Sequence, residues 1–274
     1  MYVIRRLTLR KANPDPGEKP MRASKTLKKL RSGRCARVCG MGHYLPFYIR
    51  YAAHFRFDVI WLDLEHRAMS QREVQSILAM CQQHDIDCMV RAPTQERTWL
   101  YRYLEDGATG FMIPFVSAGD TARHIVESVK FPPEGNRGID GAGLDADFGI
   151  EAWKPDSTYT KDANDQTFVV GQIETAEAVD NLDEIAAVPG LDILFVGPAD
   201  LGLRLGENGN LDDAVQAVAD AASKYGKAWG IAGGTPEQLS RYRQMGAQML
   251  IAAGDFALVK VLEEGCEILD ETVE

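Results

Sequence analysis

Eight short apolar segments, rich in β-branched residues, recur along this 274-residue chain with amphipathic stretches between them. Regular alternation of this kind predicts parallel strands joined by helical crossovers. Eight such units close naturally into one parallel (β/α)8 barrel, a TIM barrel. An open doubly wound sheet is the alternative, but the Gly-rich phosphate turn that usually follows its first strand is only weakly approximated by residues 39–43. The expected strands are Cys35–Cys39, Asp58–Leu62, Asp87–Arg91, Gly110–Pro114, Phe168–Glu174, Asp192–Val196, Ala228–Ala232 and Met249–Ala253.

The amphipathic stretches predict helices, and Thr235 before Pro236, with Gln238 three residues on, is a good helix start. The expected helices include Gln71–His84, Glu96–Asp106, Ala118–Val129, Ala176–Ala187, Leu211–Tyr225 and Pro236–Met245. Barrels of this length usually form one domain, so we expect a barrel domain over residues 24–274. Residues 1–23 form a basic extension, for which contact with RNA or a membrane surface is a weaker alternative to a solvated arm.

The overall charge narrows the class of partner. A net charge of −10 and a pI of about 5.1 argue against nucleic acid as the main partner, because phosphate binding needs a basic surface. No apolar run approaches the roughly 20 residues of a membrane span. The five cysteines are odd in number and scattered, which favours free thiols in a reducing, cytoplasmic compartment.

Polar residues gather at the ends of several predicted strands. In a parallel barrel all these ends lie on the C-terminal face, where the active sites of this fold are built. A single carboxylate there is more often a helix cap, and it is the convergence from four strands that favours a site. The residues are Asp63, Glu65 and His66 after the second strand, Arg91 in the third, Gln172 and Glu174 in the fifth, and Asp200 after the sixth.

Glu174 and Asp200 supply two carboxylates without a nearby thiolate or histidine. This donor set suits a hard cation such as Mg²⁺ or Mn²⁺ and leaves coordination positions open. A 2-oxo acid can fill two of them, so that the metal stabilises an enolate. The turn before Asp200 opens a helical segment, and the backbone amides of Ala199 and Asp200 are candidates to bind the substrate carboxylate. A plain tight turn is the equally weighted alternative for that segment.

Arg91 and His66 are the candidate groups for charge stabilisation and proton transfer. Arg91 can bind an enolate or aldolate oxygen through its planar fork, with a structural ion pair as the even alternative. His66 is the best general base, and Asp63 or Glu65 can set its tautomer. The other histidines are interpreted as structural or exposed, and His43 is the only one of them that we expect near the rim. No lysine stands at these strand ends, which disfavours a Schiff-base aldolase.

Several separated motifs resemble the HpcH/HpaI family of class II, metal-dependent 2-oxo acid aldolases. The resemblance spans residues 23–256 and rests on FDVIWLDLEH at 57–66, VRAP at 90–93, FPPEGNRG at 131–138, QIET at 172–175 and FVGPADL at 195–201. It implies a carbon–carbon lyase that joins pyruvate to an aldehyde with Mg²⁺, Mn²⁺ or, as a third option, Co²⁺. It also implies dimer-based homo-oligomers, up to hexamers, that exchange the last helix, here residues 256–272.

The resemblance also implies roles for single residues. His66 matches the family's catalytic base and Asp63 its histidine partner, while Arg91 matches the arginine that stabilises the enolate. Glu174 and Asp200 match the metal pair, and Gln172 matches a glutamine beside the metal that contacts substrate.

One segment departs from the family pattern. Residues 140–149 are acidic where the family has a Gly-rich stretch, and an arginine expected near Asp145 is missing. We expect this segment to lead from the fourth strand across the rim and to change the acceptor. Other readings of the chain are a CoA-thioester lyase, a 2-oxo acid decarboxylase or a macrophomate-synthase-like enzyme. A barrel that only binds a metabolite is the non-catalytic alternative.

Overall fold

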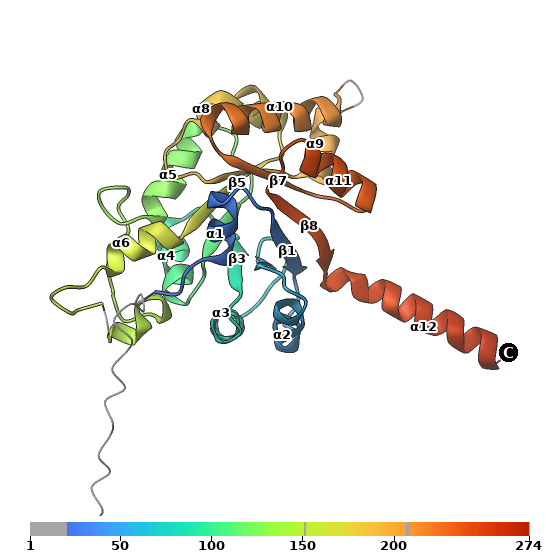
Figure 1. The fold of residues 1–274 in the computed structure, drawn as a ribbon, viewed down its shortest axis with the longest axis horizontal. Coiled ribbons are helices and arrows are strands. Elements are labelled where there is room, and N and C mark those ends of the chain that lie inside the picture. Colours follow the sequence, from blue (N-terminus) through green and yellow to red (C-terminus); the bar gives the residue numbers. More distant parts are fainter. Residues whose placement is uncertain (1–20, 151, 207–208, 274) are drawn as a thin grey trace, which may run out of the picture.

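A computed structural model describes residues 21–150, 152–206 and 209–273 of the chain. Its centre is a closed barrel of parallel strands in which each strand pairs with the next along the chain and the last pairs with the first (Figure 1). The predicted (β/α)8 barrel is therefore confirmed. The strands are β1 (Ala36–Met41), β2 (Val59–Asp63), β3 (Asp87–Arg91), β4 (Gly110–Ile113), β5 (Phe168–Ile173), β6 (Ile193–Val196), β7 (Ala228–Ala232) and β8 (Met249–Gly254).

The strands are joined or flanked by helices, most of which form the outer layer of the barrel (Figure 1). They are α1 (Lys25–Arg31), α2 (Pro46–His54), α3 (Gln71–Gln83), α4 (Arg97–Glu105), α5 (Gly119–Val129), α6 (Tyr159–Gln166), α7 (Ala176–Asp180), α8 (Leu182–Ala186), α9 (Pro198–Leu205), α10 (Leu211–Tyr225), α11 (Pro236–Gln244) and α12 (Leu258–Val273). Two short 3-10 turns are η1 (Leu144–Gly149) and η2 (Asp255–Ala257).

The expectation of one helix over residues 176–187 is wrong, because the chain forms α7 and α8 with a break at Asn181. The side-chain amide of Asn181 donates to the carbonyl oxygen of Ser117 at 2.8 Å. Asparagine often interrupts a helix, because its side chain forms hydrogen bonds that compete with the helical backbone pattern.

The apolar residues form two core layers, one inside the barrel and one between the strands and the helices. The inner layer contains Phe168 and Phe195 with several methionines and valines, all fully buried. The outer layer is larger and joins the strands to helices such as α3, α5 and α10. Strands β3 to β6 are buried at every position because both of their faces are covered. Strands of this kind have nearly continuous apolar sequences.

Capping residues fix where two of the helices begin. Ser70 and Glu73 form a reciprocal capping box at α3. At α11 the Thr235 hydroxyl accepts the backbone N–H of Gln238 at 3.2 Å, and Pro236 occupies the first turn, so the predicted start is confirmed. Helix starts of this kind place the loops before them at fixed positions on the rim.

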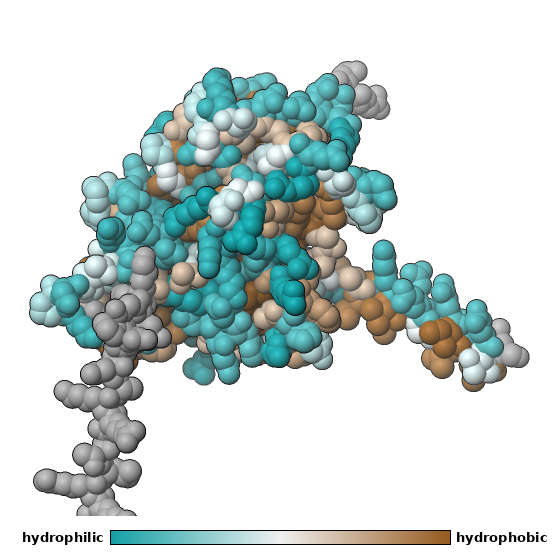
Figure 2. All heavy atoms as spheres, in the orientation of Figure 1, coloured by the Kyte–Doolittle hydropathy of each residue, from teal (hydrophilic) through white to brown (hydrophobic). Residues whose placement is uncertain are grey.

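The last helix, α12, leaves the barrel instead of packing on it (Figure 1). None of its described side chains is buried, and an apolar band runs along it beside a polar face (Figure 2). The band consists of Leu258, Val261, Leu262, Ile268, Leu269 and Val273. Strand β8 is correspondingly less covered than β3 to β6, since Leu250 is half-buried and Ala252 is exposed.

Almost all of the expected basic extension, residues 1–20, lies outside the described residues. In the part of the chain that the structure describes, no helix has the length and apolar character needed to cross a membrane.

Candidate active site

The rim at the C-terminal ends of the strands gathers the polar residues predicted from the sequence. Asp63 ends β2 and Arg91 ends β3, so these two are direct register partners on neighbouring strands. Gln172 lies in β5 and Glu174 directly follows it, whereas Ala199 and Asp200 occupy the first turn of α9 after β6. His66 lies in the loop after β2. All the predicted residues therefore lie at the same end of the barrel.

Arg91 is held firmly before any ligand is bound. Its Nε and Nη2 atoms donate to the two carboxylate oxygens of Asp63, at 3.0 and 2.7 Å. The guanidinium carbon lies 4.7 Å from the centroid of the Trp61 ring, and Arg91 is only 9% exposed. Bidentate pairing and stacking on an aromatic ring are contacts that a guanidinium makes and an ammonium does not, so this position is built for arginine.

Asp63 orders the loop that carries His66 as well as Arg91. Its Oδ1 atom accepts the backbone N–H groups of Glu65 and His66 at 3.1 and 3.2 Å. Burial alone would raise the pKa of Asp63, but the hydrogen bonds and charge of Arg91, together with these N–H groups, outweigh burial and hold that pKa below its usual value. Asp63 is therefore a firmly ionised anchor.

The imidazole of His66 is open to solvent and faces a different carboxylate. Its side chain is 55% exposed, and its Nε2 atom lies 3.5 Å from Oε2 of Glu65. Asp63 contacts His66 through the backbone, and Glu65 also lies 3.3 Å from Nε of Arg91. Glu65 thus links the imidazole to the guanidinium across the rim.

Glu174 is a buried carboxylate that no lysine or arginine within the described residues pairs with directly. Its Oε1 accepts the backbone N–H of Phe115 at 2.8 Å, and its Oε2 accepts the Gln172 side-chain amide at 2.5 Å. Burial raises the pKa of Glu174 to about 7, and the charges of Asp200 and Glu65 contribute to the rise. When the carboxylate of Glu174 is ionised, it is therefore a buried negative charge without a directly paired cation among the described residues.

Gln172 leaves one acceptor free beside this carboxylate. Its Oε1 atom is buried and has no hydrogen-bond partner in the described part of the chain. Gly197 brings the end of β6 against the same pair, since a Cβ atom there would lie 2.7 Å from Oε2 of Glu174 and 2.8 Å from Nε2 of Gln172. Only a residue without a side chain fits this approach.

Asp200 is tied to Arg204 one turn further along α9. The two side chains form an ion pair, and the guanidinium of Arg204 lies 4.8 Å from the ring centroid of Phe115. Phe115 has a φ of 53°, a left-handed conformation that is uncommon for a bulky residue. The backbone N–H of Phe115 thus donates to Glu174, while its ring contacts the guanidinium of Arg204.

A cavity of about 650 Å³ opens on this rim. Trp61, Asp63, Arg91, Phe256 and Val259 are among the residues that line it. The other predicted site residues, His66, Gln172, Glu174, Ala199 and Asp200, are not among them. The volume of the cavity lies in the range of small-molecule sites. The start of α12 therefore forms part of the wall of the candidate site.

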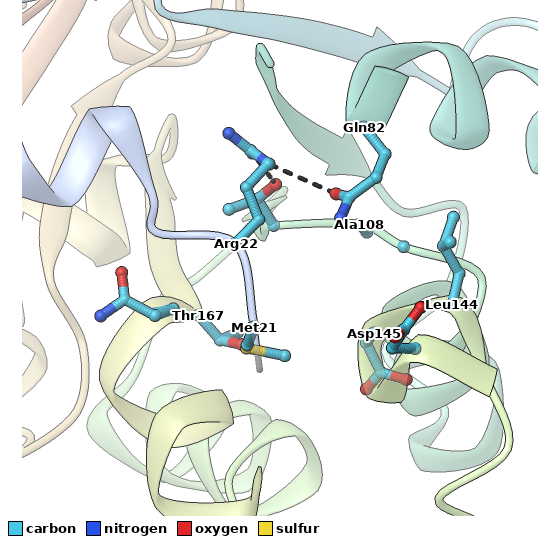
Figure 3. A pocket seen from close by; sticks show the side chains of 11 residues that line it. Met21, Arg22, Gln82, Ala108, Leu144, Asp145 and Thr167 are labelled. Atoms are coloured by element: carbon cyan, nitrogen blue, oxygen red, sulfur yellow. Dashed lines mark hydrogen bonds between the residues drawn. The ribbon is translucent and has the colours of Figure 1, made fainter. Parts of the chain in front are cut away.

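A second cavity, of about 190 Å³, lies at the opposite end of the barrel (Figure 3). Thr109 and Thr167, which directly precede β4 and β5, line it together with Arg22 and Asp145. The Nε atom of Arg22 donates to the side chain of Gln82 there. None of the predicted site residues lines this cavity, so it is separate from the candidate site.

The expectation that the acidic segment 140–149 crosses the rim is wrong for this chain. Asp145 pairs with Arg137 at 2.6 Å and accepts the Tyr159 hydroxyl at 2.8 Å, beside the second cavity. Leu144 packs so closely on Gly107, just before β4, that a Cβ atom at Gly107 would lie 2.8 Å from it. These contacts hold the segment at the N-terminal end of the barrel, away from the rim cavity.

Sequence reasoning missed several residues of the rim. Trp61, Phe115 and Arg204 contact the predicted groups, but each does so across strands or loops that no local pattern connects. Gly197, in the turn before Asp200, is a further residue of the rim to which the sequence assigns no role. Its close approach to Glu174 depends on the register of β5 and β6.

The chain matches known proteins over most of its length. A family model described as HpcH/HpaI aldolase/citrate lyase matches residues 44–259. A 2-dehydro-3,6-dideoxy-6-sulfogluconate aldolase of Pseudomonas putida is 38% identical over 208 residues, which cover 74% of this chain and 80% of that protein. A hydroxypyruvate/pyruvate aldolase of Roseovarius nubinhibens is 32% identical, with 84% of this chain and 90% of that protein covered.

A solved structure agrees with these matches. The HpcH/HpaI aldolase of Desulfitobacterium hafniense superposes with a TM-score of 0.81 at 30% identity, covering 90% of this chain and 96% of that one. The likeness therefore extends from the sequence to the whole barrel.

Proposed function

Because the chain belongs to the HpcH/HpaI aldolase/citrate lyase family, we propose that it is a class II aldolase, a divalent-metal-dependent carbon–carbon lyase. In this proposal it cleaves and forms a bond between the enolate of pyruvate and an aldehyde. The relatives in Pseudomonas putida and Roseovarius nubinhibens carry the names of aldolases. Small 2-oxo acids and aldehydes are accordingly the substrates proposed here.

Five free cysteines favour a reducing compartment, for which we propose the cytoplasm.

The observation that carries the proposal is the buried carboxylate of Glu174. It is 2% exposed, lacks a cationic partner among the described residues, and lies beside a free acceptor on Gln172 and the second carboxylate of Asp200. This set of oxygen donors fits Mg²⁺, Mn²⁺ or Co²⁺, with Glu174 and Asp200 as ligands. The described residues contain no group of three or more His, Cys, Asp or Glu side chains suited to a metal, so the proposed site has two carboxylate ligands.

When bound, a divalent cation would supply Lewis-acid stabilisation of the substrate's developing negative charge. The chain's own residues supply the rest of the chemistry. Arg91, fixed by Asp63, donates hydrogen bonds to the enolate oxygen. His66, with Glu65 beside its ring, exchanges the proton of the pyruvate methyl carbon. The first amides of α9, at Ala199 and Asp200, lack helical acceptors and bind the substrate carboxylate, while Gln172 orients the substrate.

The site has a built-in competitor for its proposed metal ligand. Arg204 pairs with Oδ1 of Asp200, so its guanidinium competes with a metal for that oxygen and leaves Oδ2 unpaired with it. The same guanidinium lies 4.8 Å from the ring centroid of Phe115, a second contact that does not depend on Asp200.

We also propose that the protein is a dimer-based homo-oligomer whose subunits exchange α12. Among the described residues no element covers the apolar band of α12, and β8 is exposed at Ala252. Helix α2 carries a second exposed apolar surface, formed by Phe47, Tyr51 and Phe55 near its end. A second copy of the chain supplies both missing partners at once, because each subunit offers the same helix and the same uncovered surface.

The proposed function is tested by proton exchange and metal dependence. We expect the methyl protons of pyruvate to exchange with D₂O in the presence of Mn²⁺ or Mg²⁺, followed by NMR, and the exchange to stop on addition of EDTA. Glu174→Ala and Asp200→Ala should abolish both Mn²⁺ binding and exchange. Glu177→Ala, at an exposed carboxylate one turn away, is the matched control and should change neither. Full exchange in excess chelator would overturn the metal assignment.

A further inference from the structure

The rim carries a second histidine, His43, which has no role in the proposed mechanism. His43 lies in the loop after β1, and Asp255 begins η2 directly after β8. Strands β1 and β8 are neighbours that close the barrel, with Val38 in register with Ile251. Closure of the barrel therefore brings His43 and Asp255 together from opposite ends of the sequence, 212 residues apart.

Asp255 holds this histidine in one orientation and one tautomer. The carboxylate is 4% exposed, and its Oδ2 atom accepts the backbone N–H of Gly42 at 2.9 Å, the backbone N–H of His43 at 2.9 Å and the Nδ1–H of the His43 ring at 2.8 Å. In the described chain, His43 is its one ion-pair partner. Donation from Nδ1 leaves the lone pair of Nε2 free, as in other carboxylate-oriented histidine bases.

The pair lies beside the cavity on the rim, which Asp255 lines and His43 does not. Gly42, Asp255 and Phe256 line that cavity together with Asp63 and Arg91. The ring of His43 meets Phe256 edge-on, with centroids 5.7 Å apart, and its side chain is 57% exposed. The imidazole is therefore anchored through Nδ1 and more than half exposed, next to residues that line the rim cavity.

Aldol chemistry needs two separate proton transfers, one at carbon and one at oxygen. We infer that His43, oriented by Asp255, is the acid–base group for the acceptor oxygen, an inference that rests on the proposed function. In cleavage, Nε2 removes the proton of the substrate hydroxyl, the new C=O forms as the adjacent C–C bond breaks, and the bonding electrons become the enolate of pyruvate. In condensation, the protonated imidazole returns the proton to the aldehyde oxygen.

The two transfers can be separated, because exchange of the pyruvate methyl protons needs no aldehyde. We expect His43→Phe, which keeps the aromatic contact with Phe256, to retain pyruvate exchange in D₂O at nearly the wild-type rate. Its condensation of pyruvate with the best acceptor among glycolaldehyde, glyceraldehyde and succinic semialdehyde should fall by about 10² or more in kcat. His66→Ala should lose both reactions. His54→Phe is the matched control, since His54 is exposed and meets Phe55 edge-on in the same way.

A metal-free measurement tests the geometry by itself. In ¹⁵N NMR of the imidazole rings, His43 should carry its proton on Nδ1 when neutral, and Asp255→Asn should remove that preference while still accepting the backbone N–H groups. Wild-type condensation in His43→Phe, or a neutral His43 protonated on Nε2, would overturn the inference and leave the proposed aldolase intact. A wild-type protein that shows no pyruvate exchange would overturn the proposed function and the inference with it.

Discussion

Among single residues, Gly197 leaves no room for a side chain beside the proposed metal ligand Glu174. A methyl group at this position would lie within 3.0 Å of both Glu174 and Gln172. We expect Gly197→Ala to displace the carboxylate of Glu174 and to weaken Mn²⁺ affinity by about 10 to 100-fold, the usual effect of disturbing groups around a metal ligand. Isothermal titration with Mn²⁺ measures this.

Gly202 provides the control for that substitution. It lies on the same helix, α9, but the nearest atom to an added Cβ is Leu211 Cδ2 at 4.0 Å. Gly202→Ala should leave Mn²⁺ affinity unchanged and raise stability slightly, by up to about 1 kcal/mol, because alanine favours a helix. Equal losses of affinity in the two variants would show that the crowding argument is wrong.

Glu174 should also make the stability of the metal-free protein depend on pH. Its folded pKa of about 7 lies above that of the unfolded chain, near 4.3. Its contribution to stability is therefore complete below about pH 4.3 and is lost as the pH rises to about 7. Relative to Glu174→Gln, the wild-type protein should become less stable between pH 5 and pH 8, as measured by urea unfolding in EDTA.

The exposed Glu177→Gln variant should track the wild-type protein at both pH values. A stability difference between wild type and Glu174→Gln that does not change with pH would mean that Glu174 is ionised as easily as a surface carboxylate.

The positions of the rim residues could be predicted because strand ends follow from local apolar patterns. Asp63, Arg91 and Glu174 were placed in this way. The left-handed backbone of Phe115 and the pairing of Arg204 with Asp200 were beyond such reasoning, since each depends on contacts between loops. Likewise, nothing in the sequence around His43 shows that Asp255 will hold it.

Among the elements, α12 carries an apolar band that is exposed to solvent, with Leu262 74% and Leu269 60% accessible. If a second copy covers the band, Leu262→Glu combined with Leu269→Glu should convert the oligomer into monomers that keep the barrel. Light scattering after size-exclusion chromatography, together with circular dichroism, measures both properties.

Glu264→Lys combined with Glu271→Lys places two changed charges on the polar face with the same spacing and should leave the oligomer intact. A wild-type protein that is monomeric at tens of micromolar would rule out the exchanged helix.

The regular elements were more predictable than the connections between them. Each strand was found because its apolar run is bounded by turn residues, and α10 was found to the residue. Segment 140–149 was misplaced, because loop direction depends on partners such as Arg137 and Gly107 that the loop's own residues do not reveal. The break at Asn181 was missed for the same reason.

For the whole molecule, the barrel interior combines large side chains with glycines at matching heights. Gly230 of β7 is in register with Phe195 and Met249, and an added Cβ would lie 2.5 Å from the carbonyl oxygen of Met249. Gly230→Ala should lower the free energy of unfolding by about 1–3 kcal/mol, the usual range for overpacking. Urea unfolding of the metal-free protein measures it.

Gly40→Ala is the comparison, since the nearest atom to its Cβ is the carbonyl oxygen of Ala253 at 3.6 Å, an ordinary contact. It should be neutral or slightly stabilising, because alanine restricts the unfolded chain. If both variants lose the same stability, the interior is less tightly packed at Gly230 than the register implies.

The position of α12 has a consequence for how the enzyme responds to dilution. Phe256 and Val259, at the start of the segment proposed to be exchanged, line the rim cavity, so the proposed subunit interface begins beside the proposed substrate site. Mass action then links subunit association to substrate binding, because dissociation of α12 from the partner would also remove support from the cavity residues Phe256 and Val259. Under the proposed assembly, specific activity should fall as the protein is diluted through its dissociation constant, and a saturating substrate should shift that constant toward tighter association.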